Sequence, residues 1–253
     1  FSSAVVGDVN GDGWNDLVVG SPHLETPERA YPNAGAAFLY LGTAEGFESS
    51  PSLQLAGYAG HSWGDELGWD VSSAGDFNGD DIPDFAIIAR NDDRPLSFGS
   101  SYAGPTTCGA KTDNVGAAFI FLGSSSGLPD ATPAFVYFGS QKSMYTDRLD
   151  GGFDINGDDK DDLILGAFRW DLNSTLLDVG QMSIVYGRAA TPGKITVICE
   201  GDFTVHGLVK SDYLGRSVAA LGDINGDGCD EVAVGADAED LSGSAAGSVR
   251  IVY

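Results

Sequence analysis

The stretch DVNGDGWND at residues 8–16 decides how this chain folds, because it recurs three more times in the same phase. The other copies are DFNGDDIPD at 76–84, DINGDDKDD at 154–162 and DINGDGCDE at 223–231. Every copy has Asp, Asn and Asp at loop positions 1, 3 and 5, glycine at position 4 and a carboxylate at position 9. Asp, Asn and Gly are common in ordinary turns, but fourfold agreement in one phase indicates a shared ligand.

The spacing of the oxygen-bearing side chains predicts a cation site in each loop. A hard cation such as calcium takes six to eight oxygens at about 2.3–2.6 Å, and alternate residues of a tight loop can face one centre. Positions 1, 3, 5 and 9 would supply side-chain oxygens, and the position-4 glycine lets the loop close. Position 7 would supply its backbone carbonyl, which explains why it varies among Trp14, Ile82, Lys160 and Cys229.

The EF-hand begins with a similar pattern, but it needs a bidentate Glu at position 12 and a helix on each side. Position 12 is occupied here by apolar residues inside apolar runs, namely Val19, Ile87, Leu165 and Val234. The sequence therefore excludes the EF-hand.

The distance between the loops predicts the fold that carries them. Their first aspartates lie 68, 78 and 69 residues apart, a period typical of repeated supersecondary units. Short runs rich in Val, Ile, Phe and Tyr follow each loop, and these are strand signals. We predict an all-β protein, a β-propeller of four-stranded antiparallel blades with repeats at about 1–57, 67–139, 149–201 and 214–253, the last blade incomplete.

Residue size predicts where the strands lie within a blade. First strands carry small residues, as at 71–74 and 218–220, which suits the crowded region near a propeller axis. Third strands carry aromatic residues, for which we expect burial between neighbouring blades. These are Phe38, Tyr40, Phe119, Phe121 and Tyr186. Residues 195–201, ITVICEG, are expected to form the fourth strand of the third repeat.

With these features the chain resembles the FG-GAP repeats that build the β-propeller of integrin alpha subunits. The resemblance rests on the four loops, on LVVGSP at 17–22 and VAVGAD at 232–237 after them, and on the Leu-Gly pairs at 67–68 and 214–215. It implies a calcium ion in each loop, up to four in all. The implied ligands are Asp8, Asn10, Asp12, Trp14 and Asp16; Asp76, Asn78, Asp80, Ile82 and Asp84; Asp154, Asn156, Asp158, Lys160 and Asp162; Asp223, Asn225, Asp227, Cys229 and Glu231.

Several positions depart from the family pattern. Glu231 replaces the usual Asp, which predicts a looser fourth site. The third repeat has no Leu-Gly pair and a shortened entry, DRLDGGFD at 147–154, so we expect an irregular first strand there. The resemblance implies seven blades, whereas only four repeats are present, so we expect a segment of a longer chain rather than a closed four-bladed ring.

Charge and composition limit the classes of molecule that this protein could bind. The net charge is −24, which argues against nucleic acid and against insertion into an anionic membrane. No run of 18 apolar residues is present that could span a bilayer. The three cysteines cannot form a disulfide framework, and Cys199 with Cys229 is the pair expected if one bridge forms.

The predicted function is calcium-stabilised adhesion or protein binding outside the cell, secreted or at the cell surface. Long loops at 21–33, 90–115 and 167–179, with 58–66, 140–148 and 202–213 beside them, would form a binding face opposite the calcium loops. Candidate contacts on it, all expected to be exposed, are His61, Trp63, Tyr102, Arg169 and Trp170. The aromatic residues leave open a glycan-binding propeller or an enzyme's accessory domain, and no catalytic residue is predicted, since the three histidines lie in no nucleophile motif.

Overall fold

The computed structural model describes residues 2–25, 33–57, 64–92, 114–141, 144–239 and 246–253. Within these ranges the regular structure consists of β-strands only, as predicted. The strands form four sheets and one short hairpin, and apart from β14, which joins the second sheet, each sheet is assembled from consecutive stretches of the chain.

Three of the four sheets have four strands or more, and the fourth has three. The first contains β1 (Ser3–Gly7), β2 (Asp16–Ser21), β3 (Ala36–Tyr40) and β6 (Leu53–Ala56); the second β7 (Leu67–Gly75), β8 (Asp84–Ala89), β9 (Ala117–Phe121), β10 (Phe135–Phe138) and β14 (Thr196–Ile198); the third β11 (Arg148–Phe153), β12 (Asp162–Ala167), β13 (Gln181–Val185) and β15 (Phe203–His206); the fourth β16 (Leu214–Gly222), β17 (Glu231–Ala236) and β18 (Ser248–Val252). The hairpin is β4 (Gly42–Thr43) with β5 (Gly46–Phe47).

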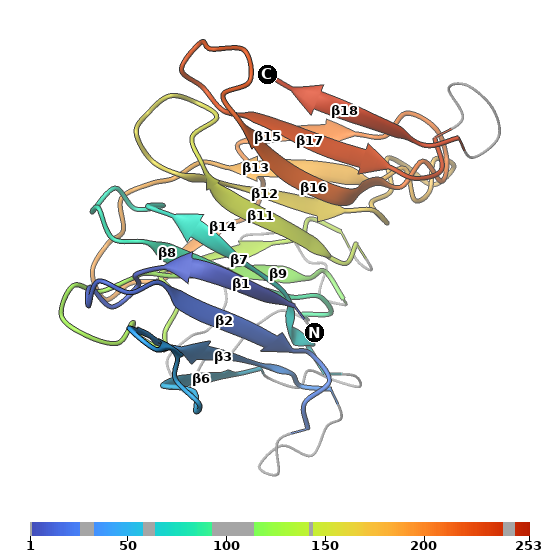
Figure 1. Cartoon of the computed structure of the whole chain (residues 1–253). Helices are drawn as coiled ribbons and strands as arrows, with labels where there is room; N and C mark the ends of the chain where they lie inside the picture. Colours follow the sequence, from blue (N-terminus) through green and yellow to red (C-terminus); the bar gives the residue numbers. More distant parts are fainter. Residues whose placement is uncertain (1, 26–32, 58–63, 93–113, 142–143, 240–245) are drawn as a thin grey trace.

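The sheets follow one another as the blades of a β-propeller, with their first strands along the inner side (Figure 1). β1 contacts β7, β7 contacts β11, and β11 contacts β16. In the described part of the chain no substantial contact joins the fourth sheet to the first, and Figure 1 places these two sheets at opposite ends. The four described blades therefore form an open arc rather than a closed ring.

Apolar side chains fill the space between each pair of neighbouring blades. Val6, Phe85 and Phe119 belong to the layer between the first and second sheets, and Phe135 and Leu163 to the next. Phe119 and Phe121 are fully buried, as the sequence predicts. Phe38, Tyr40 and Tyr186 are only half-buried. Phe38 and Tyr40 alternate with Ala37 and Leu39, which pack in the layer next to the second sheet, and so belong to the opposite face of β3.

The Leu-Gly pairs before two of the loops create a bulge that presses on the preceding blade. Gly68 and Gly215 have φ of +83° and +86°, and the pairing register shifts beside both. A Cβ atom on Gly20 would lie 2.1 Å from the carbonyl oxygen of Gly68, and one on Gly166 would lie 2.2 Å from that of Gly215. Glycine is thus required in the second strand because the neighbouring backbone occupies the space of a side chain.

The third sheet has no such bulge, which explains two departures from the repeat at once. β11 pairs regularly from Arg148 to Gly151 and spans six residues, whereas β7 and β16 span nine. The predicted shortening is confirmed; the strand begins regularly, and its irregularity is a register shift between Gly151 and Phe153. Ile88 occupies the position in β8 at which β2 and β12 have glycine. A large side chain fits there because the third blade, which packs against β8, has no bulge that would occupy its space.

We predict that Gly20→Ala destabilises the protein by about 2 kcal/mol, because either the Gly68 backbone or β2 must move to admit a methyl group. The matched control is Gly235→Ala at the same repeat position, where the only close neighbour is the rotatable Ser217 hydroxyl. Chemical denaturation of both variants measures the difference. Equal losses of stability would contradict the account of the bulge.

One strand assignment from the sequence is wrong. Residues 195–201 do not complete the third blade, since β14 pairs in parallel with β10 at the edge of the second blade. The fourth strand of the third blade is β15, which pairs antiparallel with β13. Burial explains the choice, because Ile198 is only 6 % exposed in the apolar layer that contains Phe135 and Tyr137.

The expected cysteine pair is also wrong. Cys199 is disulfide-bonded, whereas Cys229 is a free thiol. Cys229 lies in the acidic loop of the fourth sheet, whereas Cys199 follows β14, the edge strand of the second sheet. A bond between them is thus excluded.

Candidate functional site

The four acidic loops occupy equivalent places, each joining the first strand of a blade to the second. The position-4 glycines all have positive φ, between +70° and +79°. Position 6 has positive φ as well, where two loops have glycine and two have Asp81 and Asp159 at +67° and +63°. The positive φ at position 6 was not recognised in the sequence, because aspartate does not indicate a left-handed backbone as glycine does.

The position-1 aspartate holds each loop closed by accepting hydrogen bonds from the loop backbone. Asp8 accepts from the N–H groups of Asp12 and Gly13, at 3.0 and 2.7 Å. Equivalent bonds form in the other three loops, to Asp76, Asp154 and Asp223. The position-5 aspartate likewise accepts from the position-7 N–H, as from Trp14 to Asp12 at 2.9 Å.

The position-9 carboxylate is buried and ties the loop to the strands. Asp84 is fully buried and accepts from the N–H groups of Gly123 at 2.8 Å and Asn78 at 3.3 Å. Asp16 and Asp162 make the same pair of contacts, to the loop and to the glycine after the third strand. Each of these carboxylates therefore joins three segments of its own blade.

The fourth loop, in which Glu231 replaces Asp, makes different hydrogen bonds. Glu231 accepts from the N–H of Ile224 at 2.9 Å and from the side-chain amide of Asn225 at 2.7 Å. Its longer side chain thus engages a position-3 amide that is one of the implied ligands. No described glycine after the third strand takes part.

Burial raises the pKa of the three position-9 aspartates, Asp16, Asp84 and Asp162. The pKa of Asp84 rises to about 8 and that of Asp162 to about 7, in both cases chiefly because burial penalises the charged form. Nearby loop carboxylates, Asp80 for Asp84 and Asp154 for Asp162, raise the pKa further. A divalent cation beside these groups would act in the opposite direction, because it favours their charged form.

The donor set suits a hard cation, whereas the side chains of the described residues do not converge on one point. All side-chain donors at positions 1, 3, 5 and 9 are carboxylate or amide oxygens, the ligands that calcium prefers. No group of three or more His, Cys, Asp or Glu side chains among the described residues is arranged so that it could hold a metal ion. The carboxylates are instead turned toward the N–H groups of their own loops.

Acids at position 8 connect neighbouring loops, a role that was not recognised in the sequence. The N–H of Asp76 donates to Asp161 of the next blade at 2.6 Å, and the N–H of Asp154 donates to Asp230 at 3.0 Å. The main chains also bond in the reverse direction, from Asp161 N–H to the Asp76 carbonyl. The sequence signal that could have indicated this contact is the aspartate at position 8 of both the third and the fourth loop.

The opposite ends of the strands carry the loops predicted to bind a partner. Arg169 is exposed there, whereas Trp170 is only 9 % exposed and packs with Met144 and Val179 while stacking on His206. The expectation that Trp170 is exposed is therefore wrong. His61, Trp63 and Tyr102 lie outside the described residues.

Exposed apolar side chains on this face were not recognised in the sequence. Leu172 and Leu177 lie in the loop between β12 and β13, and Leu208 and Val209 lie between β15 and β16. The two loops are joined by a hydrogen bond from the N–H of Ser211 to the carbonyl of Leu177 at 3.0 Å. We call these four residues the apolar loop patch.

Comparisons with known proteins agree with the repeat pattern. The family model for the FG-GAP repeat matches residues 1–40 and 214–252. Integrin alpha-7 of Homo sapiens is 30 % identical over 167 residues, which are 65 % of this chain and 12 % of that protein. Integrin alpha-5 of Xenopus laevis is 30 % identical over 171 residues, 65 % of this chain and 14 % of the relative. Integrin alpha-PS2 of Drosophila melanogaster is 29 % identical over 180 residues, 67 % and 11 %.

The chain thus spans only about an eighth of the length of these relatives. Among the residues that the structure describes, no helix has the length and apolar character needed to cross a membrane.

Proposed function

Because this chain is an FG-GAP repeat protein with the blades of an integrin-alpha-like β-propeller, we propose that it is a calcium-stabilised adhesion module that binds a protein partner. The proposal places it outside the cell, secreted or on the cell surface. The disulfide at Cys199 supports that location, since such bonds persist in oxidising compartments. The net charge of −24 supports a protein partner over nucleic acid.

In this proposal calcium is a structural component and not part of the binding surface. Each bound ion would supply positive charge to a loop in which several carboxylates lie close together, and would stabilise the link between first and second strands. The fully buried Asp84 and the hydrogen bond that Asp161 accepts from the neighbouring blade favour such a structural role, because they fix the loops to the blades.

The observation that carries the proposed binding face is the apolar loop patch. It lies at the ends of the strands opposite the acidic loops, and Leu208, 68 % exposed, is its most accessible member. Leu208 and Val209 are adjacent, and the hydrogen bond from Ser211 to Leu177 brings their loop to the loop of Leu172 and Leu177. Exposed apolar residues that lie together are typical of protein-binding surfaces. Catalysis has no comparable support, since the described histidines His23 and His206 contact aromatic rings.

A panel of purified extracellular matrix proteins, immobilised and probed with the calcium-loaded chain, tests the proposal. We expect saturable binding to at least one of them, weakened at least about tenfold by Leu208→Asp with Val209→Asp, because burying two new charges costs more than 1.4 kcal/mol. The matched control is Leu128→Asp, since Leu128 is 46 % exposed on the acidic-loop side and lies in the turn whose Ser124 bonds to Val9.

Three outcomes would overturn the proposed function. They are the absence of binding to any matrix protein, an equal loss in the Leu128 variant, and binding to a glycan array in place of proteins. The last would support the alternative of a carbohydrate-binding propeller, for which the buried Trp170 offers no stacking surface.

A further inference from the structure

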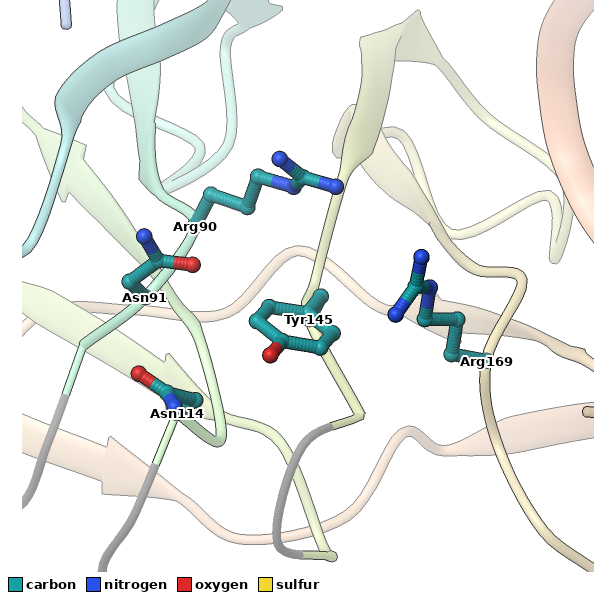
Figure 2. Close-up of a pocket in the computed structure, with 5 residues that line it drawn as sticks. All are labelled: Arg90, Asn91, Asn114, Tyr145 and Arg169. Atoms are coloured by element: carbon teal, nitrogen blue, oxygen red, sulfur yellow. The ribbon is translucent and has the colours of Figure 1, made fainter.

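A pocket of about 400 Å³ lies between the second and third blades, on the face opposite the acidic loops. Arg90, Asn91, Asn114, Tyr145 and Arg169 line it. Figure 2 shows the guanidinium groups of Arg90 and Arg169 beside the Tyr145 ring, the first above it and the second to its right in this view. Their central carbon atoms lie 5.3 Å (Arg90) and 5.4 Å (Arg169) from the centre of that ring.

The repeat architecture fixes the central ring of this pocket. Tyr145 has a φ of +52°, and Glu66 and Tyr213 occupy the equivalent place before the first strands of their blades with φ of +57°. In all three, the N–H donates to the carbonyl of a residue before the third strand of the previous blade, Asn114 in the case of Tyr145. The backbone conformation is thus set by the fold, and the tyrosine side chain is what distinguishes this pocket from the Glu66 position.

The two arginines differ in the charge they leave for a ligand. Arg90 is 2.6 Å from the buried carboxylate of Asp147 and lies over the Trp69 ring at 4.1 Å. Burial raises the pKa of Glu66, and the nearby charge of Arg90 opposes that rise. Arg169 is exposed, lies near the rings of Tyr145 and Phe168, and forms no ion pair with any residue that the structure describes. Among the described residues, the pocket therefore presents one fixed guanidinium paired with a carboxylate and one guanidinium without such a pair.

We propose that this pocket binds the carboxylate of an Asp or Glu side chain presented by the protein partner, an inference that rests on the proposed function. Arg169 provides the neutralising charge and a planar fork that matches a carboxylate. Arg90, held in place by Asp147 and Trp69, lines the other side of the pocket with N–H donors in a fixed position.

The charge balance favours a carboxylate over a more highly charged anion. Among the described residues only one guanidinium of the pocket has no carboxylate partner, which matches one negative charge, and the strongly acidic chain as a whole opposes a dianion such as phosphate. In a chain with 13 basic and 37 acidic residues, a pocket with two arginines is also the place where an acidic side chain meets the least repulsion.

The test is an NMR titration of the ¹⁵N-labelled, calcium-loaded chain with the peptide Ac-Gly-Glu-Gly-NH₂, observing the side-chain Nε–H signals of Arg90 and Arg169 and the indole N–H of Trp69. We expect saturable shifts of these signals, and at least tenfold weaker binding of Ac-Gly-Gln-Gly-NH₂. Arg169→Gln is expected to weaken binding of the Glu peptide about tenfold, the loss typical of a charge-assisted hydrogen bond. Arg169→Lys keeps the charge but loses the planar fork, so its affinity for the Glu peptide is expected to lie between those of the unsubstituted protein and Arg169→Gln.

Arg216→Gln is the matched control. Arg216 is another partly exposed arginine over an aromatic ring, 4.3 Å from the centre of Phe168, but it does not line the pocket. Unchanged binding in that variant, with unchanged melting temperatures in all variants, is the expected result.

Equal binding of the Glu and Gln peptides, or no effect of Arg169→Gln, would overturn the inference. Inorganic phosphate or a sialylated trisaccharide binding more tightly than the Glu peptide would overturn it in favour of another anion. Because the titration uses a free peptide and the matrix-protein assay uses Leu208, Val209 and Leu128, a negative result here leaves the result of that assay standing.

Discussion

Removal of calcium is expected to lower the melting temperature of this protein by tens of degrees. A ligand that binds only the native state contributes about 2.7 kcal/mol when its free concentration is a hundred times its Kd. In a domain of this size each kcal/mol corresponds to roughly 2–4 °C. Four loops filled in this way would together raise the midpoint by roughly 20–40 °C.

The loops explain why the effect should be global rather than local. Asp161 and Asp230 bond to the first residues of the preceding loops, so neighbouring blades share their acidic loops. The loss of ions from one loop therefore weakens the contact between two blades.

Melting curves by circular dichroism in 1 mM calcium chloride and in excess chelator measure the difference. Magnesium at the same concentration is the control, because it prefers a rigid octahedral shell with several waters and should restore much less stability. Coincident curves with calcium and with chelator would contradict the prediction.

The substitution Asp84→Ala is expected to destabilise the protein by about 4 kcal/mol. Asp84 is fully buried, and its removal leaves the N–H groups of Gly123 and Asn78 without their acceptor. Each such loss costs about 1–3 kcal/mol. The corresponding fall in melting temperature is roughly 10 °C.

Two further variants separate this role from general loss of charge. Asp84→Asn keeps one acceptor oxygen and should lose about half as much stability, since an amide nitrogen cannot accept the second bond. Asp130→Ala removes an exposed acid that accepts only a local bond from Thr132 and should change stability by less than about 0.5 kcal/mol. A similar fall in melting temperature for Asp84→Ala and Asp130→Ala would show that the buried contacts of Asp84 do not matter.

The fold was predictable because its signal is repeated. Four loops in one phase and aromatic third strands defined blades, and Phe119 and Phe121 lie buried between sheets as expected. The strand at 196–198 was not predictable, because an apolar run shows that a strand is buried but not which blade edge it joins. Likewise, the bulge at Gly68 explains Gly20 only when the two blades are seen together.

The candidate sites differ in how far the sequence could define them. Each acidic loop spans nine residues, so its pattern is visible in the sequence. The hydrogen bond between Asp161 and Asp76 involves only one further element, the neighbouring loop. The pocket of Arg90, Tyr145 and Arg169 draws on two blades, and no local pattern joins these residues. Trp170 illustrates the reverse error, since its burial depends on His206, which lies 36 residues further along the chain.

The number of calcium ions bound per chain tests the account most directly. Isothermal titration of the chelator-treated and dialysed protein with calcium chloride should give four ions per chain, and three for the Asp84→Ala variant under conditions in which it remains folded. Absence of saturable calcium binding, or the same stoichiometry in both proteins, would contradict the claim that the four acidic loops are calcium sites.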